Sequence, residues 1–221
     1  MSLNSKIENV IIRENYGHSL GNVLEFIVNN YANLPNSIAF VKANVVPRHT
    51  TLEHLSASLE HTALTPIYHD PKLVSKPGIS GLIAPGFFWE INNSWYVEFR
   101  NHEFFCDFNK FLEFLFVDFR NPEVIVFAPG GCMIVERDRI TKYPKSFYET
   151  LHYLVTYRFF PSEAFMVERL LLTLFLADYQ LHPHLNDFEN CREILNSTKI
   201  SQHECASGRR SIFSRMKSIL K

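Results

Sequence analysis

Near the N-terminus, the hydrophobic pattern predicts a strand, a helix and a second strand. Val10–Ile12 form a short apolar run, and apolar residues then recur at helical spacing over Leu20–Tyr31. A β-rich run, Ser37–Val46, follows the turn-forming Leu34-Pro35-Asn36. Elements in this order normally make a parallel strand pair with a right-handed crossover. We therefore expect functional side chains just beyond the carboxyl ends of these strands.

The rest of the chain continues to alternate short strands with helices. The predicted elements are a helix over Thr51–Glu60, an irregular loop over 66–86, a hairpin of Phe87–Ile91 with Trp95–Arg100, a helix over Phe104–Phe116, strands over Glu123–Pro129 and Cys132–Val135 separated by a Gly130-Gly131 turn, and helices over Lys145–Tyr157 and Ser162–Tyr179. The predicted fold class is α/β, with a mixed sheet flanked by helices and a β-hairpin insertion.

Composition limits the size and the partners of this fold. The chain has 221 residues, of which 46% are hydrophobic, and this is enough for one substantial core. Lys and Arg number 22 against 23 Asp and Glu, so the basic excess typical of nucleic-acid-binding proteins is absent. The four cysteines form no CxxC pair, which argues against a zinc knuckle or a redox dithiol. We expect a single domain over 1–196 and no nucleic-acid partner.

The C-terminal stretch differs from the domain that precedes it. Residues 197–208 have the polar composition of a linker, and residues 209–221 carry five positive charges without an acidic residue. Apolar residues recur at helical spacing in 209–221, which predicts a basic amphipathic helix for an anionic membrane surface or a partner groove. The alternative is a basic helix docked on its own domain. We see no signal peptide and no membrane-spanning run, so we expect a cytoplasmic protein. The basic stretch further suggests peripheral attachment at the inner face of the membrane.

Three stretches of the chain resemble one known family. Asn15–His49 resembles a segment with an Asn-x-Gly element, a helix ending in Asn-Tyr-x-x-Leu-Pro, and a strand ending near Pro-Arg-His. Pro129–Val155 and Ala164–Phe175 resemble its small-residue strand and its Glu-Arg-Leu helix. This is a glycosyltransferase-like family of bacteria and fungi, of undefined function, with similarity to capsular-polysaccharide glycosyltransferases. The resemblance implies a GT-A-like α/β core and the use of a nucleotide sugar.

The acidic Asp-x-Asp metal motif of such transferases is absent from this sequence. Its expected place after the strand holds Lys42-Ala43-Asn44. A divalent metal remains an open question, and cationic side chains are an alternative way to stabilise a diphosphate leaving group. The expected donor and phosphate-binding residues are Arg13, Asn15, Gly17, Lys42, Asn44, Arg48 and His49. The alternative for Arg48 and His49 is a simple strand end at the surface.

Three carboxylates are candidates for the catalytic base. Glu168 lies in the middle of an apolar helix, where a carboxylate is costly unless it is paired or faces a cleft. Because Arg169 is adjacent, a structural ion pair is the alternative for this position. Glu136 and Asp138 are the other candidate acids. They follow the Cys132–Val135 strand, which comes after the Gly130-Gly131 turn.

Two tryptophans complete the predicted site. Trp89 and Trp95 can offer a face on which an acceptor sugar stacks, although hairpin aromatics also commonly belong to a core. The leading hypothesis is a glycosyltransferase that moves a sugar from a nucleotide-sugar donor to a glycan or lipid-linked acceptor. The alternative is a noncatalytic binding or scaffold protein of the same fold with a degenerate donor site.

Overall fold

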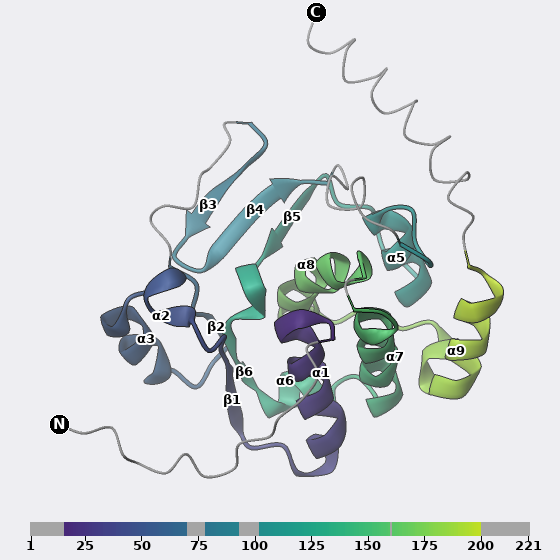
Figure 1. Cartoon of the computed structure of the whole chain (residues 1–221), viewed down its shortest axis with the longest axis horizontal. Coiled ribbons are helices and arrows are strands. Elements are labelled where there is room, and N and C mark those ends of the chain that lie inside the picture. Colours follow the sequence, from purple (N-terminus) through teal and green to yellow (C-terminus); the bar gives the residue numbers. More distant parts are fainter. Residues whose placement is uncertain (1–15, 70–77, 93–101, 160, 200–221) are drawn as a thin grey trace, which may run out of the picture.

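The computed structural model describes residues 16–69, 78–92, 102–159 and 161–199 (Figure 1). The α-helices are α1 (His18–Asn30), α2 (Val45–Arg48), α3 (Leu52–Leu59), α5 (Phe108–Leu115), α6 (Arg137–Thr141), α7 (Lys145–Thr156), α8 (Glu163–Leu176) and α9 (Phe188–Ser197). The strands are β1 (Ser37–Phe40), β2 (Thr65–Pro66), β3 (Ser80–Ala84), β4 (Phe87–Ile91), β5 (Val124–Phe127) and β6 (Met133–Glu136). Short 3-10 turns lie at Tyr31–Asn33, Pro129–Gly131 and Pro183–Asn186.

The strands form two small antiparallel sheets, ordered β1-β6-β2 and β3-β4-β5. The α/β class is therefore confirmed, but the expected parallel arrangement is not found in the described part of the chain. β1 runs antiparallel to β6, with Phe40 opposite Met133 and Ser37 opposite Glu136. Val10–Ile12, the predicted parallel partner, lies outside the described residues. The second strand is also shorter than expected, because the chain leaves it after Phe40 and enters α2.

The Pro129–Gly131 turn carries the chain from one sheet to the other. β5 lies at the edge of its sheet and β6 lies at the centre of the other. Gly130 and Gly131 have φ angles of 73° and 66°, in the left-handed region that favours glycine. The predicted Gly130-Gly131 turn is thus confirmed, and it joins two sheets.

The predicted hairpin contains the right first strand and the wrong second one. β4 pairs with β3 across Pro85-Gly86 on one edge and with β5 on its other edge. Because both edges are occupied, the expected pairing with Trp95–Arg100 is replaced. Residues 93–101 lie outside the described part of the chain.

Helices α1, α7, α8 and α9 pack together, with α8 against β5, whereas α2 and α3 lie apart from them near β2 (Figure 1). α7 contacts α1, α8 and α9, and its side chains Leu151 and Leu154 are fully buried. The helix predicted over Ser162–Tyr179 is confirmed by α8, although α8 ends at Leu176 instead of Tyr179, and most of its side chains are buried. None of the helices in the described ranges is long and apolar enough to cross a bilayer. The predicted tail, 209–221, lies outside those ranges.

A buried ion pair joins α8 to the middle strand of the second sheet. The guanidinium of Arg169 donates from Nε to Glu90 Oε1 and from Nη2 to Glu90 Oε2, the latter at 3.2 Å. Each side chain is only 4% exposed. The Arg169 guanidinium also lies 4.7 Å from the centre of the Phe127 ring. This two-point geometry fixes the rotation of α8 against β4 and β5.

We expect Arg169→Met to lower the free energy of unfolding by about 3–5 kcal/mol, because the buried Glu90 carboxylate would lose both of its bonds to the guanidinium. Urea denaturation followed by circular dichroism measures this. The double variant E90L/R169M should recover much of the loss, since it leaves neither charge buried. Lys110→Met serves as a control that breaks an exposed pair with Glu113, at a cost of about 0.5 kcal/mol or less. Equal effects of R169M and K110M would contradict a structural role for the buried pair.

Candidate functional site

A groove of about 720 Å³ lies where the carboxyl end of β1 meets the first turns of α1. Three of the predicted phosphate-binding residues, Lys42, Asn44 and Arg48, line it. The other lining residues are His18, Ser19, Asn22, Val23, Phe26, Ala39, Phe40, Val41 and Ala43. The structure therefore brings the predicted cations of 42–48 together in one open hollow.

The register of β1 against β6 positions Lys42. Because Phe40 is opposite Met133, the chain after β1 passes beside Cys132 and the Gly130-Gly131 turn. A Cβ added to Gly130 would lie 2.7 Å from Lys42 Nζ, so the lysine side chain rests directly on this glycine. Glycine at position 130 thus leaves room for the ammonium group.

The thiol of Cys132 lies beside Lys42 but is not an activated nucleophile. Burial raises the pKa of Cys132, and the carboxylate of Glu168 also raises it, while the backbone N–H and the ammonium of Lys42 act in the opposite direction. Since the burial effect is the largest, the thiol stays protonated near neutral pH. Cys132 therefore packs with Val45, Ile67 and Ile134 and is not a candidate nucleophile.

Arg48 and Asn44 reach the groove from a single turn of helix. Asn44 precedes α2, and Val45 buries its side chain among Ile67, Cys132 and Ile134. This anchor holds Arg48 at an exposed position on the groove wall. Within the described ranges, neither Lys42 nor Arg48 forms an ion pair with a carboxylate. Two cations without acidic partners in one concavity favour an anionic ligand.

The opposite wall of the groove comes from the start of α1. His18 has a φ of 54°, which is uncommon for a residue with a side chain. Ser19 donates a hydrogen bond from Oγ to the carbonyl oxygen of Gly130 at 3.3 Å. Sequence reasoning missed Ser19 and Asn22, which lie within five positions of the Asn-x-Gly element. Strained backbone of this kind is found preferentially at functional sites.

Gly17 is required by packing, whereas its expected role was donor binding. Its φ is 68°, and an added Cβ would lie 2.5 Å from the carbonyl oxygen of Val155 on α7. Glycine here allows α1 to begin in close contact with α7. Arg13 and Asn15, the other predicted residues of this segment, lie outside the described part of the chain.

His49 does not line the groove. Its ring packs against Tyr68, with 5.1 Å between ring centres, and its backbone carbonyl accepts a hydrogen bond from His69 N at 2.7 Å. Among the residues that the structure describes, no group of three or more His, Cys, Asp or Glu side chains is placed to hold a metal ion. His49 therefore belongs to the packing between α2 and the segment after β2.

Glu168 does not line the groove and is held by two structural hydrogen bonds. Its Oε1 accepts from the backbone N–H of Gly130, and its Oε2 accepts from Arg169 Nη1 at 3.2 Å. The side chain is 20% exposed. The ion pair with Arg169, the alternative reading of the sequence, is therefore present, and Glu168 fixes the Pro129–Gly131 turn on which Lys42 rests.

The two alternative acids lie at the other end of β6. Glu136 ends β6 opposite Ser37 and forms an ion pair with Arg139. Asp138 follows it in α6, with its side chain 95% exposed. Because β1 and β6 are antiparallel, the strand end that carries Glu136 is the one farthest from Lys42. The three carboxylates therefore do not form one site.

Trp89 lies on the second sheet, away from the groove's lining. In β4, Phe88 and Glu90 are buried while Phe87, Trp89 and Ile91 are half-buried, so Trp89 is on the face opposite the Glu90–Arg169 pair. Trp95 lies outside the described residues. Neither residue is therefore placed beside Lys42 and Arg48 by the described structure.

Comparisons with protein-family models, with curated proteins and with solved structures give no match to this chain.

Alanine substitutions at two glycines separate backbone strain from close packing. Gly78 has a φ of 74° with open space around its Cα, whereas Gly17 has a similar φ and no room for a Cβ. We expect Gly78→Ala to cost about 1–2 kcal/mol of unfolding free energy, from strain alone. Gly17→Ala should cost a further ~1–3 kcal/mol, because the methyl group overpacks the contact with Val155. Denaturant titration of both variants measures the difference, and equal losses would show that the α1–α7 contact yields without cost.

Proposed function

We propose that this chain binds the diphosphate of a nucleotide sugar in the groove between α1 and α2 and transfers the sugar to a glycan or lipid-linked acceptor. The observation that carries the proposal is the convergence of Lys42 and Arg48, without acidic partners in the described residues, on one groove. The resemblance of Asn15–His49 to the glycosyltransferase-like family supports the same residues, since the groove is built largely from that segment.

The chemistry of the groove suits the departure of a diphosphate. A leaving nucleoside diphosphate gains negative charge as the glycosidic bond breaks, and fixed cations stabilise that charge without a metal. Arg48 offers a planar fork of N–H donors for phosphate oxygens, and Lys42 offers a compact charge. Asn44 and Ser19 add hydrogen-bonding groups for ribose or sugar hydroxyls.

A noncatalytic binding protein is the second candidate function, and one observation favours it. No Asp or Glu is among the residues that line the groove, and the nearest predicted base, Glu168, is occupied by Gly130 and Arg169. A general base must reach the acceptor hydroxyl directly or through one water. Transfer by Glu168 therefore requires it to exchange one of these bonds for the acceptor.

Membrane attachment is part of the transferase proposal. The five positive charges of 209–221, with no acidic residue, suit the anionic inner leaflet, where a lipid-linked acceptor is found. Attachment at that surface would bring the groove close to a lipid-linked acceptor in the membrane.

Ligand binding to the groove is tested by thermal unfolding with a panel of nucleotides and nucleotide sugars, with and without Mn²⁺. A ligand that binds only the native state raises the unfolding midpoint. We expect one nucleotide class to give a selective shift, and Arg48→Gln or Lys42→Met to weaken its binding about tenfold, in line with the loss of one charge-assisted contact. Lys145→Gln, an exposed lysine of α7 outside the groove, is the matched control. Equal binding by all variants would place the ligand elsewhere, and a flat panel would overturn the nucleotide-sugar proposal.

Release of free sugar or transfer to an acceptor separates the two candidate functions. If the protein is a transferase with Glu168 as base, Glu168→Gln should retain nucleotide binding and lose transfer by about 10²–10⁴-fold. Binding without turnover in the unmodified protein would favour the noncatalytic alternative.

A further inference from the structure

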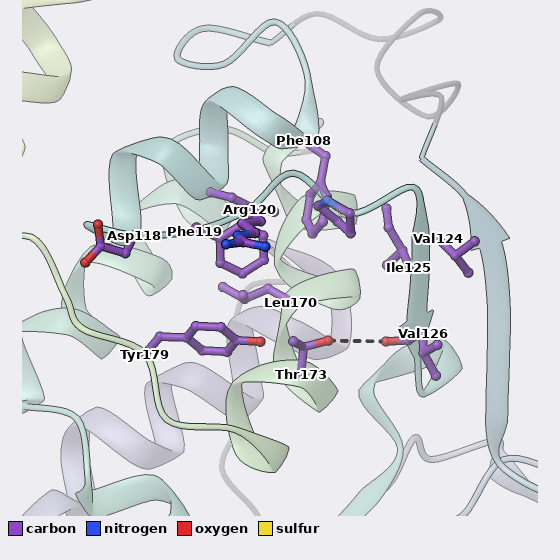
Figure 2. Close-up of a pocket in the computed structure, with 12 residues that line it drawn as sticks. Phe108, Asp118, Phe119, Arg120, Val124, Ile125, Val126, Leu170, Thr173 and Tyr179 are labelled. Carbon is purple, nitrogen blue, oxygen red and sulfur yellow. Dashed lines mark hydrogen bonds between the residues drawn. The ribbon is translucent and has the colours of Figure 1, made fainter.

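A second cavity, of about 470 Å³, lies between α5, β5, α8 and the loop 117–122 (Figure 2). It shares no lining residue with the groove. Its floor is made of core side chains, among them Phe108, Leu112, Ile125 and Leu170, each no more than 3% exposed. This volume is within the usual range for small-molecule sites, and an apolar floor favours an apolar ligand body.

The loop over this cavity is tied down at both ends. Val117 donates its backbone N–H to Gln180 O at 3.0 Å, and the side chain of Asn92 donates to Pro122 O at 2.9 Å. The side chain of Asn121 bonds to Glu113 on α5. Because these contacts are made by the protein alone, the cavity is preformed, and a ligand need not order the loop.

Two hydroxyl groups interrupt the apolar lining. Thr173 of α8 donates from Oγ1 to Val126 O at 3.5 Å, and the hydroxyl of Tyr179 points toward Thr173 in Figure 2. Burial raises the pKa of Tyr179, so its phenol remains a hydrogen-bond donor at neutral pH. A polar group of a ligand would find the Tyr179 hydroxyl as a donor and the Thr173 oxygen as an acceptor at this side of the cavity.

The cavity also follows the open edge of β5. Asn92 N bonds to Glu123 O, and hydrogen-bonded pairs alternate along an antiparallel ladder. The backbone groups of Val124 and Val126 therefore point away from β4, toward the cavity. The bond from Thr173 to Val126 O agrees with this direction.

The charged residues at the cavity indicate the charge of the ligand. Arg120 lines it from the loop and forms no ion pair within the described ranges. Asp118 also lines it, but Figure 2 shows its carboxylate directed away from the other lining residues. An arginine fork beside an apolar cavity matches a carboxylate attached to an apolar body.

We propose that the cavity between α5, β5 and α8 binds a small amphipathic carboxylate, with its apolar chain on Leu112, Ile125 and Leu170 and its carboxylate paired with Arg120. This site is separate from the proposed nucleotide-sugar groove, so either assignment can fail without the other.

Isothermal titration of the full chain with octanoate, 1-octanol and octylamine, each below its aggregation concentration, tests the proposal. We expect saturable binding of octanoate, weaker binding of octanol and the weakest binding of octylamine. Arg120→Gln should weaken the binding of octanoate about fivefold and leave the binding of octanol unchanged. The effect on octanoate is modest because Arg120 is exposed. Val124→Trp, at an exposed lining position, should weaken octanoate and octanol together by filling the cavity.

Arg192→Gln, which removes an exposed arginine of α9, is the matched charge control and should bind octanoate as the unmodified protein does. The proposal is overturned if octanoate fails to saturate one site, if R120Q weakens octanol as much as octanoate, or if V124W leaves both affinities unchanged. Thermal unfolding of each variant shows that it is folded before titration. Nucleotide binding by R120Q and V124W should equal that of the unmodified protein, which separates this site from the groove.

Discussion

Two consecutive residues of α8 hold the two sheets in place. Arg169 forms the buried two-point ion pair with Glu90, at the middle strand of the β3-β4-β5 sheet. Glu168 accepts a hydrogen bond from Gly130, in the turn that leads into β6 at the centre of the other sheet. Since neighbouring helical residues point about 100° apart, one turn of α8 reaches both structures. The position of Lys42, which rests on Gly130, depends on this arrangement.

The same dependence explains why Glu168 is a poor fit to a free catalytic base. A carboxylate inside an apolar helix is stable only when its oxygens are satisfied, and here a backbone N–H and a guanidinium satisfy them. The groove presents the cations Lys42 and Arg48, two asparagine amides and one hydroxyl instead of acids. The groove is therefore suited first to binding an anion, and a transfer step would require that binding.

The sequence located the cationic wall of the groove because the relevant residues are close together in the chain. Lys42, Asn44 and Arg48 lie within seven positions, so any chain path that keeps 42–48 at the end of a strand brings them near one another. Glu136 and Asp138 are candidate acids in the sequence because they follow the end of the strand after the Gly130-Gly131 turn. The antiparallel register of β1 and β6 placed them at the opposite strand end. Trp89 was assigned by residue type, and the pleat of β4 turned it away from the Glu90 face.

The sequence by itself determined the α/β class, the positions of α1, α3, α7 and α8, and the glycine turn between β5 and β6, because these follow from local periodicity and from backbone freedom at Gly130-Gly131. Tertiary structure decided how the strands pair, which partner Arg169 chooses and which carboxylates remain exposed. Strand pairing and buried ion pairs join residues far apart in the chain, such as Glu90 and Arg169, and local patterns carry no information on such partners. The cavity beside Arg120 exists only because α5, β5 and α8 meet there.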